Sequence, residues 1–132
     1  MTGVQTCALP ISPTPPSTTT PSGTRALPAL ARAAHTLGDP DLLARLATDV
    51  PDTLPSQQHA LATVRAIQAE QAGDHAKAAS LYAGAADRWE QFTAVLEQGH
   101  ALLAQGRCQT HTGDPNADQP LRQAREIGRA HV

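Results

Sequence analysis

Three Gly–Asp pairs, which begin at Gly38, Gly73 and Gly113, constrain the fold of this chain more than any other feature. Around them, apolar residues recur at spacings of three and four, which is typical of one face of an α-helix. Before the first pair, these residues are Leu27, Leu30, Ala31, Ala34 and Leu37. Because glycine commonly ends a helix and aspartate commonly begins one, each pair predicts a tight turn between two helices.

The turns follow one another at intervals of 35 and 40 residues. Periods of this size indicate a solenoid, and the tetratricopeptide repeat is a helix–turn–helix unit with a length of about 34 residues. A small residue lies seven positions before each turn glycine, where two helices would approach closely: Ala31, Ala66 and Gly106. The pattern predicts an all-α, tetratricopeptide-like α-solenoid fragment of about three helix pairs, at residues 24–51, 55–92 and 93–125. The alternative is a plain helical bundle whose turns recur by coincidence.

The composition excludes some classes of fold and some classes of binding partner. Aromatic residues make up only 2% of the chain, which excludes an all-β fold because pleated sheets pack with β-branched and aromatic side chains. With a formal net charge of -2, the chain has no basic field for a phosphate backbone. No apolar run reaches the length of a membrane span. We therefore expect a cytoplasmic protein that binds neither nucleic acid nor membrane.

The two ends differ in character from the rest. Residues 12–23, SPTPPSTTTPSG, predict a disordered Pro/Ser/Thr-rich linker; the alternative is a PxxP ligand at Pro13 to Pro16. Residues 1–11 and 126–132 resemble the translated strands of a common sequencing adapter, so we expect the natural segment to lie within Ser12 to Arg125 and to be part of a longer protein. Cys108 would then be the one natural thiol, and no intramolecular disulfide would form.

The stretch AADRWEQFTAVLEQGHALLAQGRC, followed by a Gly–Asp turn and PLRQARE, is more specific than a generic repeat. It resembles the C-terminal helical-repeat region of large actinobacterial signalling proteins, in which an adenylate/guanylate cyclase or LuxR-type module is coupled to an ATPase and a tetratricopeptide arm. The residues that carry the resemblance are Gly38-Asp39-Pro40, Gly73-Asp74-His75, Ala85, Arg88-Trp89, Glu97, Ala101-Leu102-Leu103, Gln105-Gly106-Arg107-Cys108 and Gly113. The resemblance spans roughly residues 26–125 and implies an arm that binds partners while other domains perform catalysis.

Candidate chemistry along the chain is sparse. The chain has no Gly-x4-Gly-Lys-Ser/Thr phosphate loop, and its histidines are scattered rather than spaced as metal ligands. Cys108 is expected to be a packed thiol rather than a nucleophile. Asp39, Asp74 and Asp114 are expected to cap helices. We therefore predict no catalytic, cofactor-binding or metal site.

The remaining hypothesis is a partner-binding surface. In a repeat of this type, the first helix of each pair lines the inner surface, which nominates a mixed-charge groove of Thr63, Glu70, His100, Arg107 and His111. An ordinary solvated face is the alternative. The aromatic residues Tyr82, Trp89 and Phe92 are expected to form a core cluster.

We therefore expect a non-catalytic protein-interaction or regulatory arm that binds a protein, a peptide or other domains of its parent chain. Two alternatives remain open. In the first, the chain is a piece of a cyclase or ATPase that lacks the catalytic domain. In the second, it is an artefact of sequence assembly and has no independent role.

Overall fold

The computed structural model describes residues 15–130, with side chains from Ala26 onward. Its helices are α2 (Pro15–Leu37), α3 (Pro40–Asp49), α4 (Pro55–Gln71), α5 (His75–Gln91), α6 (Val95–Thr112) and α7 (Asp118–Ala130). No strand occurs within residues 15–130, and the all-α prediction is confirmed. The adapter-like residues 1–11, Pro13 of the PxxP motif and His131 lie outside the described residues.

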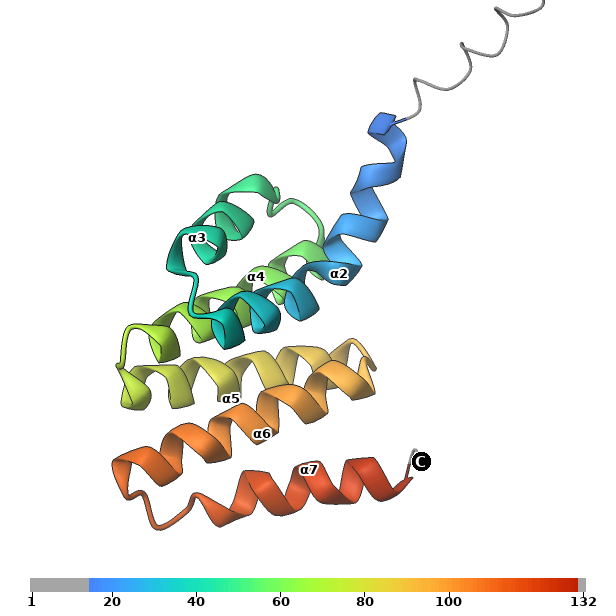
Figure 1. Cartoon of the computed structure of the whole chain (residues 1–132). Coiled ribbons are helices and arrows are strands. Elements are labelled where there is room, and N and C mark those ends of the chain that lie inside the picture. The colour runs from blue at the N-terminus through green and yellow to red at the C-terminus, as the bar shows by residue number, and fades with distance from the viewer. Residues whose placement is uncertain (1–14, 131–132) are drawn as a thin grey trace, which may run out of the picture.

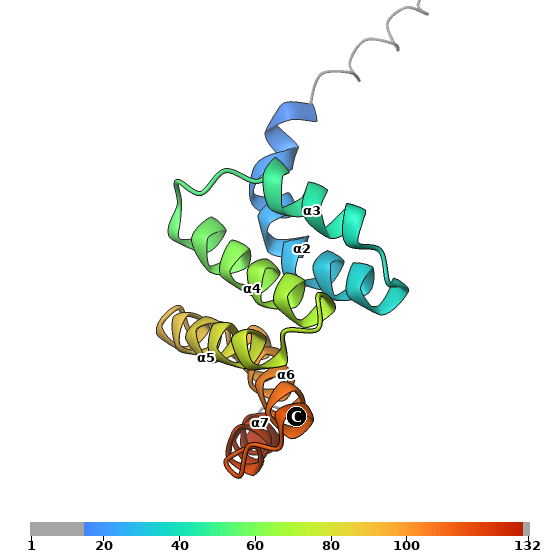
Figure 2. The same ribbon diagram turned by 90° about the vertical axis from the view of Figure 1, so that its left-hand side faces the viewer.

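From α4 to α7 the helices follow one another down the molecule in chain order, and α2 and α3 lie together at the upper end (Figure 1). The main packing joins α2 to α3 and α4, α3 to α4, α4 to α5, α5 to α6, and α6 to α7. In the view turned by 90°, α2, α3 and α4 gather at one end and α5, α6 and α7 at the other (Figure 2). Each helix therefore packs mainly against helices that are near it in the sequence.

The three predicted turns are present and share one geometry. Gly38, Gly73 and Gly113 have φ values of 70°, 88° and 75°, in the left-handed region that glycine adopts without a steric cost. At each turn the next residue donates its backbone N–H to a carbonyl five residues back, as Asp74 does to Ala69 at 3.0 Å. This hydrogen bond defines a Schellman motif, which satisfies the last carbonyl groups of a helix.

A fourth turn of the same kind joins α5 to α6 at the predicted boundary between the second and third pairs, although its geometry was not predicted. Ala94 donates its backbone N–H to the carbonyl of Trp89 at 2.9 Å, again five residues back. The left-handed position is held by Thr93, with φ of 57°. Because a β-branched residue rarely adopts this conformation, the sequence contains no turn signal here.

Replacing Thr93 with glycine should relieve the strain at this turn. A left-handed conformation costs an L-residue roughly 1–2 kcal/mol, and part of the gain is offset because glycine is more flexible in the unfolded chain. We expect Thr93→Gly to raise the free energy of unfolding by about 0.5–1 kcal/mol, measured by denaturant titration. The matched control, Gly73→Thr, should lower it. A Thr93→Gly variant less stable than the parent would contradict the argument.

Two predictions about helix ends were wrong. Residues 15–23, expected to be disordered, form the first part of α2, which projects beyond the other helices in both views. Proline is tolerated in a first helical turn because its missing N–H has no partner there, so Pro15 and Pro16 do not prevent a helix. Asp114 does not cap α7: its Oδ1 accepts the N–H of Asn116 at 2.8 Å, and the helix begins four residues later.

The other predicted caps have the expected geometry. Asp39 Oδ1 accepts the backbone N–H of Leu42 at 3.1 Å, and Asp74 Oδ1 accepts that of Lys77 at 3.2 Å. At the C-terminal end, α7 continues past Arg125 to Ala130.

The core is built largely from small side chains. Ala31, Ala60, Ala66 and Ala78 are fully buried, so neighbouring helices approach closely. The remaining members of the same core are Leu27, Ala34, Leu43, Leu61, Val64, Ile67, Ala69, Ala79, Tyr82, Ala85, Ala86, Trp89, Ala101, Leu102, Ala104, Cys108 and Ala124. Gly106 is the extreme case, because a Cβ atom there would overlap Leu121 of α7. The predicted close approach is therefore confirmed for the third pair.

Some predicted core positions are exposed. Leu30 and Leu37 flank the packed stripe of α2 and retain 49% and 76% of their accessible surface. Phe92, at the end of α5, retains 46%, whereas Tyr82 and Trp89 are buried as predicted. The spacing of three and four therefore identified the packed face of α2 but overestimated its width.

Candidate functional site

The first helices of the three pairs, α2, α4 and α6, meet around a small cavity of about 90 Å³. It is lined by Arg32, Thr63, Ile67, Tyr82, His100, Ala101, Leu103, Ala104 and Arg107. Three of the five nominated residues, Thr63, His100 and Arg107, therefore lie around one cavity.

Glu70 is buried rather than exposed, which corrects the prediction that it lines an open groove. Its Oε1 accepts hydrogen bonds from the Tyr82 hydroxyl at 2.7 Å and from Arg107 Nη2 at 2.8 Å. Its Oε2 accepts one from Arg107 Nε at 2.7 Å. His35 Nε2 of α2 lies 3.7 Å from Oε1. One carboxylate thus joins α2, α4, α5 and α6, which explains why it is tolerated inside the stack.

The partners of Glu70 determine its charge state. Burial alone favours the neutral carboxyl, but hydrogen bonds from Arg107 and Tyr82 and the positive charge of Arg107 outweigh it, so the pKa falls to about 2. For Tyr82, burial and its hydrogen bond to Glu70 raise the pKa far above the ordinary value. At neutral pH the cluster therefore contains a carboxylate, a guanidinium and a neutral phenol.

Thr63 is buried as well, and it has a structural role. Its Oγ1 accepts the indole N–H of Trp89 at 2.8 Å and donates to the backbone carbonyl of His59 at 3.3 Å. The hydroxyl is thus engaged on both sides, and its predicted place on an exposed surface was wrong. A hydroxyl at this position satisfies the buried indole.

His100 lines the cavity, next to an ion pair that joins α2 to α6. Arg32 Nη1 of α2 donates to Glu97 Oε1 of α6 at 2.7 Å. Burial, reinforced by the charge of Arg32, lowers the pKa of His100. His100 therefore contributes a neutral imidazole at neutral pH.

His111 lies apart from the cavity and is exposed. Its ring stacks on that of His75, with the centroids 4.2 Å apart and the planes inclined by 4°.

Cys108, also on α6, is fully buried, and burial raises the pKa of its thiol to about 11. The thiol is therefore protonated and weakly nucleophilic at neutral pH, as the packed-thiol prediction requires.

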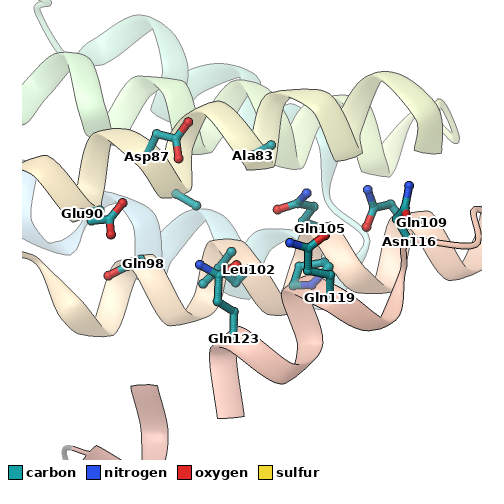
Figure 3. Close-up of a pocket in the computed structure, with 12 residues that line it drawn as sticks. Ala83, Asp87, Glu90, Gln98, Leu102, Gln105, Gln109, Asn116, Gln119 and Gln123 are labelled. Atoms are coloured by element: carbon teal, nitrogen blue, oxygen red, sulfur yellow. The ribbon is translucent and has the colours of Figure 1, made fainter. Parts of the chain in front are cut away.

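A second groove, of about 210 Å³, runs across α5, α6 and α7 (Figure 3). Amide side chains dominate its lining: Gln98, Gln105 and Gln109 from α6, and Asn116, Gln119 and Gln123 from the following turn and α7. Asp87 and Glu90 of α5 face it from the other side. Sequence reasoning missed this groove, although the spacing of seven and four between the glutamines of α6 was a signal that they share a face.

A third hollow, between α6 and α7, is mostly apolar and holds about 460 Å³. It is lined by Val95, Leu96, Gly99, His100, Leu103, Ala124, Ile127 and Gly128. It adjoins the 90 Å³ cavity, because His100 and Leu103 line both.

Comparison of the chain with protein-family models, curated proteins and solved structures gave no match. Within residues 15–130, no helix is both long enough and apolar enough to cross a bilayer. The resemblance to the helical arms of signalling proteins therefore stays a prediction from the sequence.

Proposed function

We propose that this chain is a tetratricopeptide-like helical-repeat arm that binds a protein or peptide and performs no catalysis itself. The observation that carries the proposal is the convergence of α2, α4 and α6, the first helices of the three pairs, on one cavity. In this interpretation the arm belongs to a larger cytoplasmic signalling protein, whose cyclase, ATPase or DNA-binding modules lie elsewhere.

The packing supports a repeat rather than a plain bundle. Its main contacts join helices that are near neighbours in the chain, as in solenoids, in which each unit contacts only the next. Short hydrogen-bonded turns join α4 to α5 and α5 to α6, so successive helices reverse direction. Such stacks expose an extended inner surface, which repeat proteins use for binding.

The chemistry of the inner face indicates what it binds. Arg32 and Arg107 are already paired with Glu97 and Glu70, so little positive charge remains to attract an anion. Leu103, by contrast, is 47% exposed and lines both the cavity and the adjoining apolar hollow. The surface thus suits a peptide segment with an apolar anchor residue among polar neighbours.

Selection of peptides against the immobilised chain tests the proposal. Peptides that bind the inner face should carry an apolar anchor, and Leu103→Asp should weaken them by about tenfold or more, because a carboxylate would occupy the anchor site. Leu37→Asp is the matched control, since Leu37 is exposed at the end of α2, away from both hollows. Selected peptides that bind Leu103→Asp as tightly as the parent would contradict the assignment of the inner face.

A further inference from the structure

Three potential metal ligands from different helices converge at one edge of the stack. Glu70 lies near the end of α4, His75 begins α5, and Cys108 lies in the second half of α6. One ligand atom from each lies within 4.8 Å of those from the other two. The turn at Gly73 places the first two residues side by side, and the packing of α6 on α5 brings the third.

A second observation concerns one of these three residues. The Nδ1 atom of His75 is buried and has no hydrogen-bond partner among the described residues. A buried polar atom without a partner is costly and calls for an explanation. A bound cation supplies one, because a neutral imidazole nitrogen donates its lone pair to a metal ion.

We propose that Glu70, His75 and Cys108 bind a divalent cation of the zinc type. A thiolate, an imidazole and a carboxylate form the mixed S/N/O ligand set that zinc accepts, whereas calcium and magnesium prefer oxygen ligands alone. Three protein ligands leave the fourth tetrahedral position to water. The thiolate and the carboxylate supply two negative charges to the cation, and Arg107 stays paired with the carboxylate.

The surroundings hold the Glu70 ligand in place. Tyr82 and Arg107 donate hydrogen bonds to the Glu70 carboxylate, and such outer contacts orient carboxylate ligands in metal sites. The ring of His111 stacks on that of His75. Ligand atoms around tetrahedral zinc lie about 3.5 Å apart, given bonds of about 2.0–2.3 Å. The half-buried His75 side chain, on the first residue of its helix, closes the remaining distance by rotation.

Binding involves one proton transfer. The Cys108 thiol is protonated without a cation, and the S–H bond breaks as the sulfur–metal bond forms. The proton passes to solvent, and no oxidant or reductant takes part.

Titration of the reduced full chain with Zn²⁺ and Co²⁺ tests the site. We expect one equivalent to bind and release a proton, and Co²⁺ to give a thiolate-to-metal charge-transfer band in the near ultraviolet. Cys108→Ser should abolish that band, and His75→Gln should weaken binding by at least the roughly tenfold that the loss of an outer contact to a metal ligand costs. Circular dichroism of each variant confirms that it is folded.

Two controls make the test specific. Cys7→Ser removes the other thiol of the chain, and His100→Gln removes a histidine of the inner face; both should bind as the parent does. The absence of a charge-transfer band from the parent would overturn the proposal. Its survival in Cys108→Ser, or equal weakening by His100→Gln and His75→Gln, would also do so.

Discussion

Trp89→Ala should lower the free energy of unfolding by about 3–5 kcal/mol, the range for removing a large aromatic side chain from a core. Trp89 is 6% exposed and is the largest side chain in the stack. Its indole N–H donates to Thr63 at 2.8 Å, and its ring meets those of His59 and Phe92 edge to face. The substitution therefore removes packing between α4 and α5 as well as a buried hydrogen bond. Denaturant titration followed by circular dichroism measures the effect.

Two further variants separate these contributions. Trp89→Phe keeps most of the apolar contact but leaves Thr63 without the indole donor, and should cost about 1–2 kcal/mol from the hydrogen bond. Phe92→Ala, at a side chain that is 46% exposed, should cost much less than Trp89→Ala. An unchanged denaturation midpoint in Trp89→Ala would reject the buried role of the indole.

Glu70→Gln should have the second large effect, and its size should depend on pH. The pKa of Glu70 in the folded chain is about 2, below its ordinary value of 4.5. A lowered pKa means that the ionised carboxylate stabilises the folded state, by about 3 kcal/mol at neutral pH. The contribution is complete above pH 4.5 and is lost as the pH falls toward 2. Glutamine lacks the charge, so the parent and the variant should converge at low pH.

Stability measured from pH 7 to pH 2 checks this result. Arg107→Gln is the matched variant, because it removes the other partner of the ion pair and should also lose acid-sensitive stability. A difference between parent and Glu70→Gln that stays constant from pH 7 to pH 2 would show that the carboxylate is not the stabilising group.

The helices were predictable because their signals are local. Leucine and alanine spacing, the left-handed glycines and two of the three aspartate caps follow from backbone chemistry within a few residues. The geometry of the turn at Thr93 was not predictable, because a β-branched residue holds the left-handed position against its own preference. The helical residues 15–23 show the same limit, since composition alone indicated disorder.

The site was predictable only in part, because burial depends on contacts between distant residues. Helical periodicity placed Thr63, His100 and Arg107 on the inner side of their helices, where the structure has them around one cavity. It did not show that Glu70 is buried, since that requires Arg107, which lies 37 residues away, as its partner. The cluster of Glu70, His75 and Cys108 was hidden for the same reason: its ligands lack the sequence spacing of a metal motif and meet only through packing.

The helices α4, α5 and α6 are nearly equal in length, at 17, 17 and 18 residues, and this has an electrostatic consequence. Because tight turns reverse the chain between them, each edge of the stack alternates helix N-termini with helix C-termini (Figure 1). A helix carries about half a positive charge at its N-terminus and half a negative charge at its C-terminus. The dipoles of neighbouring helices therefore oppose one another, and a stack of this kind can lengthen by whole repeats without accumulating an electric field along its helices.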